Sequence, residues 1–396
     1  MKKILYVHHG KGLGGAPLSL LYLIQGLDKT KYEPVVLFLH DSPAFDLYRS
    51  KGLNPLGPVG RYDFSHTKIW WFRWYHPHLL FRSVRDTCIT LYKIADHWLE
   101  KIKPDLIHLN TSSLIAWGKV AWKKGIPVVW HVREPLASGY FGVRKTIITH
   151  FVEKYADAIV PICKHDANPW KNLAKTHVVY NTVDQKVFDH TICPDVFLQT
   201  YNLEKIDPKI LFLGGLSEEK GTLVILRVFE KLLQQIPNAK LLIAGYFAKQ
   251  QGMGVKKLFP SYKFSVQVWD IFERLKKSVM LLGPIHNVPQ AMAASDVIVF
   301  PATVGHFARP IIEAGFMKKP VVASALSPLE ELVVDSRTGF LVDPQDLDRW
   351  VGKLACLLHD KVLNKQMGEQ AFEFCTIMFE LKKYIAKIQS IYDNVL

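Results

Sequence analysis

Residues 4–27 read ILYVHHGKGLGGAPLSLLYLIQGL, and this order of residue types sets the fold of the first part of the chain. The apolar run at 4–7 predicts a β-strand, and the apolar-rich run at 17–27 predicts an α-helix. Glycines at positions 10, 12, 14 and 15 lie between them. Glycine allows a tight turn and a close approach of a ligand to the backbone. Because backbone N–H groups and the helix dipole meet there, the turn predicts a site for an anion such as a phosphate.

The ligand of this turn is not identified by residues 8–20 alone. They contain no P-loop signature, in which Gly-Lys is followed by Ser or Thr. A glycine-rich turn also serves a purely structural purpose where a helix packs closely against a sheet. Both interpretations fit the stretch.

Short apolar runs alternate with helical stretches along the chain. They occupy 34–39, 105–110, 127–132, 158–162 and 177–181, and then 209–215, 239–246, 278–283, 296–302, 319–325 and 338–344. Such Val, Ile and Leu runs between helices are typical of parallel strands covered on both faces. A polar, irregular stretch at 184–208 separates the two sets, and residues 346–396 are helical by pattern. We therefore expect an α/β fold with two Rossmann-like, doubly wound domains in tandem.

Composition limits the class of protein and of partner. The 396 residues carry a formal net charge of +14, which favours acidic partners such as nucleotide phosphates, an anionic membrane face or nucleic acid. No nucleic-acid motif accompanies this charge, so we do not expect nucleic acid as the partner. Five scattered cysteines without a CxxC pair indicate unpaired thiols in a reducing compartment. We expect a cytoplasmic protein without a signal peptide or a membrane-spanning run, attached at most to a membrane surface.

One segment departs from the average composition. Residues 61–85 read RYDFSHTKIWWFRWYHPHLLFRSVR and mix aromatic with basic side chains. The aromatic residues either pack into the core of the first domain or form a surface that contacts a membrane interface or an acceptor. Stacking on nucleic-acid bases is a third alternative. For the acceptor alternative, the candidate residues are Trp71 and Arg73.

The second half of the chain contains a comparable glycine turn. Residues 211–222 read LFLGGLSEEKGT, a strand that ends in Gly214 and Gly215 and is followed by a helix start with Lys220. A helix N-terminus beside a lysine suits a diphosphate, although a lysine there is also common as a solvated side chain. Arg309 and Glu313 lie one helical turn apart in HFARPIIEAGFMKKPVVAS (306–324). They form either a plain surface ion pair or a cation and a carboxylate in one cleft, where Arg binds phosphate oxygens and Glu accepts from ribose hydroxyls.

Five stretches in this order resemble the retaining, nucleotide-sugar-dependent glycosyltransferases of family 4, which have the GT-B fold. GGLSEEKG (214–221) is similar to the family's G-R-L-x-x-x-K-G turn, and RPIIEAGFMKKPVVAS (309–324) to its E-A-M-A-x-G-x-P-V-V-A stretch. SPLEELVVDSRTGFLVDPQD (327–346) is similar to the stretch that follows in the family. YNTVD (180–184) resembles the hinge N-G-V-D, and HHGKGLGGAPLSL (8–20) resembles the N-terminal glycine loop.

The resemblance implies two domains that face each other across a cleft. Residues 184–375 would form the domain that binds the nucleotide sugar, and residues 1–183 the acceptor-side domain, joined by a C-terminal helix at 376–396. Glu313 would hold the ribose. Lys220 and the backbone of Gly214 to Gly221 would hold the diphosphate. Gly14 and Gly15 would close over the phosphate or the transferred sugar from the first domain.

His131 is the candidate catalytic residue of the first domain, together with Lys220 and Glu313 of the second. It lies in VVWHVREP, after a predicted strand, where the family has a histidine near the sugar. The carboxyl ends of parallel strands line the usual ligand crevice, although a single histidine is often structural. Arg133 and Glu134 follow it, and they either orient His131 or bind the acceptor.

Two positions depart from the family pattern. Gly215 stands where the family has its diphosphate-binding arginine, and Gly305 where it has a first glutamate. Either Arg309 replaces the missing cation, or donor binding is altered and activity is low.

The implied reaction moves a hexosyl or deoxyhexosyl group from a UDP-, GDP-, ADP- or dTDP-sugar, with retention, to a hydroxyl of a glycan or of a lipid-linked saccharide. Fixed cations and helix N-termini would stabilise the leaving diphosphate. No Asp-x-Asp motif or His/Cys/Asp cluster stands out, and the resemblance implies neither an obligatory metal nor a cofactor. A degenerate, non-catalytic GT-B protein and a sugar-nucleotide epimerase are the alternatives.

Overall fold

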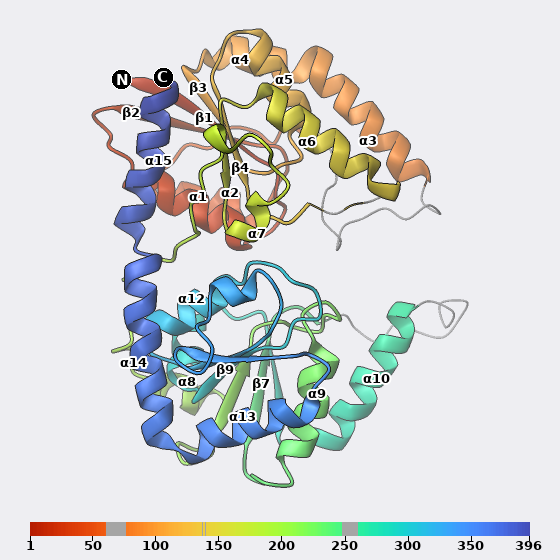
Figure 1. The fold of residues 1–396 in the computed structure, drawn as a ribbon, viewed down its shortest axis with the longest axis vertical. Helices are drawn as coiled ribbons and strands as arrows, with labels where there is room; N and C mark the ends of the chain where they lie inside the picture. The colour runs from red at the N-terminus through yellow and green to blue at the C-terminus, as the bar shows by residue number, and fades with distance from the viewer. Residues whose placement is uncertain (61–76, 137, 139, 248–259) are drawn as a thin grey trace. The chain divides into compact units, whose positions relative to one another are not determined.

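The computed structural model describes residues 1–60, 77–136, 138, 140–247 and 260–396 (Figure 1). The predicted acceptor residues Trp71 and Arg73 therefore lie outside the described residues. The chain divides into two compact units. Unit 1 comprises Met1–Thr182 with Leu381–Leu396, and unit 2 comprises Val183–Glu380.

Unit 1 contains a five-stranded parallel sheet in the order β2-β1-β3-β4-β5. Its strands are β1 Lys2–His8, β2 Tyr32–Phe38, β3 Leu106–Leu109, β4 Val128–Val132 and β5 Ala158–Pro161. Every residue of β3, β4 and β5 is buried, as expected for strands covered on both faces. The residues of each strand alternate between the two faces, so that two apolar clusters form, one on each face.

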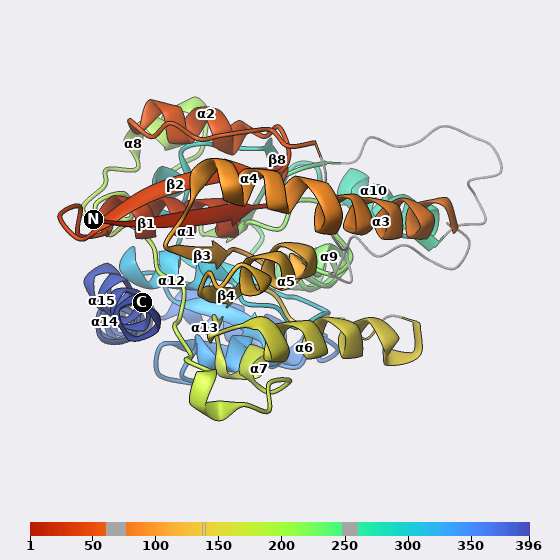
Figure 2. The same ribbon diagram turned by 90° about the horizontal axis from the view of Figure 1, so that it is seen from above.

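The helices of unit 1 cover these two faces. They are α1 Gly15–Gly26, α2 Pro43–Ser50, α3 Pro77–Ile89, α4 Ala95–Ile102, α5 Ile115–Lys123, α6 Val143–Tyr155, α7 Lys164–Ala167 and α15 Leu381–Val395. A π-helical turn, Thr90–Ile94, joins α3 to α4, and 3₁₀ turns lie at Tyr140–Gly142 and Leu173–Lys175. Helices α4, α5 and α6 lie side by side over one face (Figure 2). Helices α1 and α15 pack on the other face, where Ile388 and Tyr392 bring the end of the chain into the core.

Unit 2 contains a six-stranded parallel sheet in the order β11-β10-β9-β6-β7-β8. Its strands are β6 Lys209–Phe212, β7 Lys240–Ala244, β8 Val279–Gly283, β9 Val297–Phe300, β10 Val321–Ser324 and β11 Gly339–Val342. Its helices are α8 Asp195–Thr200, α9 Thr222–Leu232, α10 Pro260–Leu275, α11 Val288–Ala293, α12 Arg309–Phe316, α13 Leu347–His359 and α14 Lys361–Met378, with a 3₁₀ turn at Leu329–Glu331. The largest apolar cluster packs α9 and α13 against the sheet.

These two sheets confirm the prediction of two doubly wound α/β domains. The prediction of a strand at 177–181 is wrong, because the structure has no strand there. His177 N donates to Ile159 O (2.8 Å) and Val179 N to Pro161 O (3.0 Å), and the segment then leaves the sheet edge. These two backbone bonds to β5 are too few to form a β-ladder, so the apolar run does not become a strand.

The order of the strands defines where a ligand site belongs in each sheet. In unit 1 the chain passes from β1 to β2 on one side and then crosses to β3 on the other side of β1. In unit 2 it builds β7 and β8 on one side of β6 and then places β9 on the other. Ligands of doubly wound sheets bind at the carboxyl ends of the strands at this switch point. A ligand site is therefore expected at the loops after β1 and β3 in unit 1, and at the loops after β6 and β9 in unit 2.

Candidate functional site

In unit 2, the loop after β6 is a rigid turn that leads into α9. Ser217 N donates to Thr222 Oγ1 (2.8 Å), and this hydroxyl donates to Gly215 O (3.0 Å). Gly221 is the N-cap of α9, with φ of +83°. A Cβ there would collide with the carbonyl oxygen of Pro301, which follows β9. The loops after β6 and β9 thus pack directly against each other at the switch point, and glycine is required for that approach.

Lys220 lies at the end of this turn and is partly buried. Burial lowers the pKa of its ammonium group. The charge of Lys220 also contributes to lowering the pKa of His306, after the larger effect of burial on that imidazole. The charge of Lys220 therefore acts on the loop after β9, which contains His306.

Arg309 and Glu313 lie in the first turns of α12, directly after the β9 loop. Arg309 Nε donates to Glu313 Oε1 at 2.7 Å, and the side chains are only 14% and 5% exposed. The pair is therefore buried and is not the surface ion pair that the i, i+4 spacing also allowed. Arg309 Nη1 is buried without a hydrogen-bond partner among the described residues. The structure thus provides a donor nitrogen suited to an anionic oxygen.

Neighbouring carbonyl groups explain both departures from the family pattern. Gly215 has φ of +62°, and a Cβ there would lie 2.6 Å from Tyr246 O. At Gly305 a Cβ would collide with the carbonyl oxygen of Ser327. Neither backbone position accepts a side chain, so arginine and glutamate are excluded there by the local path of the chain.

We therefore expect Gly215→Arg and Gly305→Glu, which restore the family residues, to destabilise the protein and not to raise its activity. At Gly215, where φ is +62°, a non-glycine residue adds backbone strain on the order of 1–3 kcal/mol to the steric clash. At Gly305 the steric clash with Ser327 O is the cause of the destabilisation. Thermal unfolding and initial rates of the two variants measure this. A stable variant with higher turnover would contradict the steric explanation.

In unit 1, the carboxyl ends of β1, β3 and β4 bring together a set of buried polar side chains. His131, in β4, is fully buried, and Arg133 beyond its end is only 8% exposed. Arg133 Nε donates to Asn110 (2.5 Å) and Nη1 to Asn181 (2.7 Å). Its Nη2 lies 3.4 Å from His131 Nδ1. Arg133 thus contacts His131 and the two asparagines, and its predicted role, either to orient His131 or to bind the acceptor, stays a prediction.

Glu134 is bonded to the loop after β3. Its Oε1 accepts from Thr111 Oγ1 (2.6 Å), Ser112 N (3.1 Å) and Ser112 Oγ (3.1 Å). The carboxylate therefore fixes the loop at the switch point. This loop also carries Asn110, the partner of Arg133.

The glycine turn before α1 is solvent-exposed. Gly14 is the N-cap of α1, and no side chain caps the helix there. A Cβ at Gly14 or Gly15 would meet no atom within 4 Å, so packing does not require glycine at either position. The first backbone N–H groups of α1 are consequently available to a ligand.

Several residues of the unit 1 cluster were not predicted from the sequence. They include His8, His108, Asn110, Asn181 and Tyr392. The signal for His8 and Asn110 was present, because each lies at the end of a predicted strand. Tyr392 had no such signal, since it reaches the cluster from the last helix of the chain.

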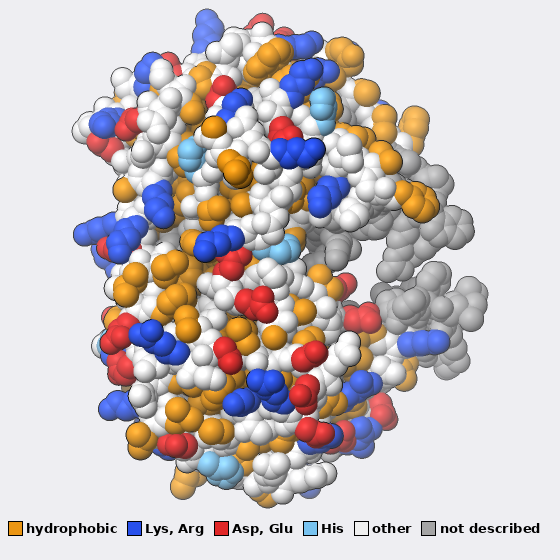
Figure 3. Space-filling view, in the orientation of Figure 1, with side chains coloured by type: hydrophobic (Ala, Val, Ile, Leu, Met, Phe, Trp, Pro, Cys, Tyr) orange, Lys and Arg blue, Asp and Glu red, His pale blue; other side chains and the backbone are white. Residues whose placement is uncertain are grey.

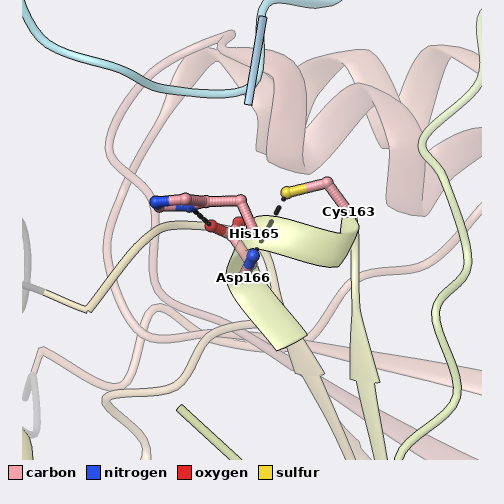
Figure 4. Close-up of side chains that lie close together, drawn as sticks. All are labelled: Cys163, His165 and Asp166. Carbon is pink, nitrogen blue, oxygen red and sulfur yellow. Dashed lines mark hydrogen bonds and ion pairs between the residues drawn. The ribbon is translucent and has the colours of Figure 1, made fainter. Parts of the chain in front are cut away.

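A separate group, Cys163, His165 and Asp166, lies where β5 leads into α7 (Figure 4). The sequence prediction overlooked it. One atom of each residue lies within 4.8 Å of the others, close enough to suggest metal ligands. The thiol instead accepts from Asp166 N (3.4 Å) as the cap of α7, and His165 Nδ1 lies 3.1 Å from Asp166 Oδ1. Burial raises the pKa of Asp166 to about 6. The group thus forms a helix cap and a hydrogen-bonded His–Asp pair.

Charge on the surface is mixed. On the face drawn in Figure 3, Lys and Arg side chains alternate with Asp and Glu and do not form one basic patch. Within the described parts of the chain, no helix is long and apolar enough to cross a bilayer.

Comparison with known proteins agrees with the fold and the motifs. The model for "Glycosyltransferase Family 4" matches residues 13–187, and that for "Glycosyl transferases group 1" matches residues 197–374. A relative from Escherichia coli, UDP-Gal:alpha-D-GlcNAc-diphosphoundecaprenol alpha-1,3-galactosyltransferase, is 26% identical over 78% of this chain and 79% of its own length.

Solved structures have the same architecture. Anabaena HepE, crystallised with UDP and glucose, superposes with a TM-score of 0.78 at 19% identity, over 99% of this chain and all of that one. A glycosyltransferase from Rickettsia africae gives 0.76 at 17% identity, over all of this chain and 98% of its own. The protein is thus a glycosyltransferase with the GT-B fold. More particularly, the family 4 resemblance predicted from its motifs is confirmed by the family 4 model in the first half of the chain, together with the group 1 model in the second half.

Proposed function

We propose that the chain is a retaining hexosyltransferase that moves a sugar from a nucleoside diphosphate sugar to a hydroxyl of a glycan or a lipid-linked saccharide. A UDP-hexose is the first donor to consider. The E. coli relative is named for UDP-galactose and a diphosphoundecaprenol-linked acceptor, and HepE was crystallised with UDP and glucose. A lipid-linked acceptor would bring the chain into peripheral contact with the cytoplasmic face of a membrane.

The buried Arg309–Glu313 pair is the observation that carries this proposal. In the proposed complex, Arg309 Nη1 and Lys220 bind the diphosphate, and Glu313 accepts from the ribose hydroxyls. The turn from Gly214 to Gly221 adds the backbone N–H groups at the start of α9. These groups stabilise the negative charge that develops on the diphosphate as the bond to the sugar breaks. Arg309 is then the cation that replaces the arginine missing at Gly215.

In this proposal, unit 1 contributes the residues that contact the transferred sugar and the acceptor. The turn at Gly14 and Gly15 offers backbone N–H groups to the donor, and His131 contacts the transferred sugar. Glu134 holds the loop after β3 in place. Trp71 and Arg73 remain candidates for acceptor binding.

A thermal-shift screen with UDP-, GDP-, ADP- and dTDP-hexoses tests the proposed function. We expect a UDP-hexose to raise the melting temperature, because a ligand that binds only the folded state stabilises it. Lys220→Met should reduce this shift, whereas Lys277→Met, which changes an exposed lysine of the same unit, should not. If no nucleotide sugar shifts the melting temperature, the non-catalytic alternative is favoured.

A substitution at Gly15 tests whether the glycine turn contacts the transferred sugar or the nucleotide. Because a side chain at this position meets no atom within 4 Å, we expect Gly15→Leu to fold normally. The bulk should lower turnover by about ten-fold or more by displacing the sugar, and leave the affinity for UDP unchanged. The matched control is Gly352→Leu on α13, which is equally open. Equal losses of turnover and UDP affinity would instead make the turn a primary nucleotide site.

A further inference from the structure

A buried chain of hydrogen bonds crosses the sheet of unit 1. Tyr392 Oη lies 2.7 Å from His108 Nδ1, and His108 Nε2 lies 3.1 Å from His131 Nδ1. The hydroxyl of Tyr6 lies 3.1 Å from that of Tyr392. Hydroxyl groups and neutral imidazoles both donate and accept, so these contacts alone are compatible with two opposite directions of donation.

Arg133 selects one direction at His131. A guanidinium group only donates, and Arg133 Nη2 lies 3.4 Å from His131 Nδ1. This nitrogen of His131 must therefore carry a lone pair. It accepts from His108 Nε2–H, and His108 Nδ1 in turn accepts from the Tyr392 hydroxyl. Because a hydroxyl group has a single proton, the contact of 3.1 Å between the two tyrosine hydroxyls then has Tyr6 as its donor. The proton of a neutral His131 then lies on Nε2.

The same guanidinium group sets the tautomer of His8 through Asn110. Arg133 Nε donates to Asn110 at 2.5 Å, so the amide oxygen must face it. The amide nitrogen of Asn110 then faces His8 Nδ1 at 3.1 Å and donates to it. A neutral His8 consequently also carries its proton on Nε2.

Both protonated nitrogens lack a partner. His8 Nε2 and His131 Nε2 are buried and make no hydrogen bond within the described residues. A Cβ at Gly10 would lie 2.8 Å from His8 Nε2, so glycine at this position avoids a steric clash with that atom. Buried polar atoms are nearly always hydrogen-bonded, and two unmet donors at a switch point indicate a ligand with oxygen acceptors.

Burial keeps these imidazoles neutral. It lowers the pKa of His131 and of His8, and the positive charge of Arg133 lowers both further. His9 contributes to the effect on His8, and His108 to that on His131. A neutral tautomer is therefore the form that a ligand meets.

We propose that Arg133 is a positioning residue that holds His8 and His131 as Nε2–H tautomers, so that both present hydrogen-bond donors to the oxygen atoms of a ligand. The identity of that ligand as a nucleotide sugar rests on the proposed function. The acceptor oxygen belongs to a phosphate or to the transferred sugar. In either case His131 enters the reaction as a donor and not as a base.

Selective ¹⁵N labelling of histidine tests the tautomers in the ligand-free protein. Long-range ¹H–¹⁵N spectra distinguish a protonated from an unprotonated ring nitrogen, and single His→Gln variants assign the signals. We expect Nε2–H and an unprotonated Nδ1 for His8 and His131. An Nδ1–H signal from either residue in the wild-type protein would overturn the proposal without any variant being made.

Variants of Arg133 test the cause. Arg133→Met should move part of the His131 proton from Nε2 to Nδ1, while Arg133→Lys, which keeps a donor, should move less. Tyr384→Phe removes a neighbour 3.5 Å from Nη2 and should leave both tautomers unchanged. Unchanged tautomers in a folded Arg133→Met variant would refute the positioning role.

Ligand addition separates this inference from the proposed function. A change in the Nε2 signals with UDP alone identifies a phosphate oxygen as acceptor, and a change only with UDP-glucose identifies a sugar oxygen. Bound ligand without any change at either nitrogen would overturn the role of these donors. If no nucleotide sugar binds, the proposed function fails, while the tautomer measurement still decides the role of Arg133.

Discussion

Glu313→Gln is expected to lower the free energy of unfolding by about 3 kcal/mol, the lower end of the cost of breaking a buried ion pair. The substitution keeps the shape of the side chain and a carbonyl oxygen for Arg309. It removes the negative charge from a pair that is 14% and 5% exposed, and so leaves the guanidinium charge uncompensated. In the proposed complex it also weakens the contact with ribose. We therefore expect kcat/KM to fall by about 100-fold, the usual size of losing one preorganised charge-assisted contact in a closed site.

Urea unfolding and initial rates measure the two effects. Asp270→Asn on α10 is the matched control, since Arg274 Nη1 contacts Asp270 at 2.5 Å with the same i, i+4 spacing. Those side chains are 49% and 69% exposed, so solvent screens the pair and its loss should not be measurable. Equal destabilisation by the two substitutions would show that burial of the Arg309–Glu313 pair is not the cause. A stable Glu313→Gln enzyme with normal turnover would remove the proposed role in ribose binding.

The elements of the fold were predictable because burial on both faces leaves a strong local signal. Runs such as 297–300 and 321–323 are apolar throughout, as is typical of strands in the middle of a parallel sheet. The segment 177–181 also has an apolar centre, at residues 178–180, but it lies at an edge of the sheet, where His177 N and Val179 N make two backbone bonds to β5. Composition alone does not distinguish these two positions.

The candidate site of unit 2 was predictable for a similar reason. Lys220 lies in the loop after one strand, and Arg309 and Glu313 follow another, so the order of strands alone brings them to the switch point. The reason for glycine at 215 and 305 was not predictable. It depends on carbonyl groups of Tyr246 and Ser327, which are distant in sequence.

The buried hydrogen-bond network of unit 1 was even less predictable from the sequence. His8, His108 and His131 come from three strands, and Tyr392 comes from the helix that ends the chain. Each histidine, taken alone in the sequence, resembles an ordinary core residue. Their coupling appears only when the sheet order places β1, β3 and β4 together and α15 covers them.

The three buried histidines predict that unit 1 loses stability in mild acid. Burial is the main cause that lowers the pKa of His8, His108 and His131 below 6.5. Above about pH 6.5 each is neutral in both the folded and the unfolded chain, so pH has no effect through them. Below that pH the unfolded chain binds protons that the folded chain excludes, and the free energy of unfolding falls by about 1.4 kcal/mol per pH unit for each histidine.

One group in unit 1 acts in the opposite direction. Burial raises the pKa of Asp166 to about 6, so below that pH the folded chain binds a proton that the unfolded chain does not. This proton uptake offsets the loss of unfolding free energy caused by about one of the histidines. Burial lowers the pKa of His40 to about 4, which adds to the loss. The net direction is therefore a steep decrease in stability between pH 6.5 and 5.

Replacing one histidine isolates its contribution. We expect His108→Gln, whose amide can still accept from Tyr392 and donate to His131, to reduce the slope of stability against pH by about 1.4 kcal/mol per unit below pH 6.5. His97→Gln, an exposed histidine of the same unit, should leave the slope unchanged. Hydrogen exchange of the amides of β1, β3 and β4, measured from pH 7.5 to 5.5, reports unit 1 separately from unit 2. The same slope in the wild type and in His108→Gln would mean that His108 takes up its proton over the same pH range in the folded and the unfolded chain. In that case burial would not be what keeps His108 neutral, and below pH 6.5 the protonated imidazole could not accept from Tyr392.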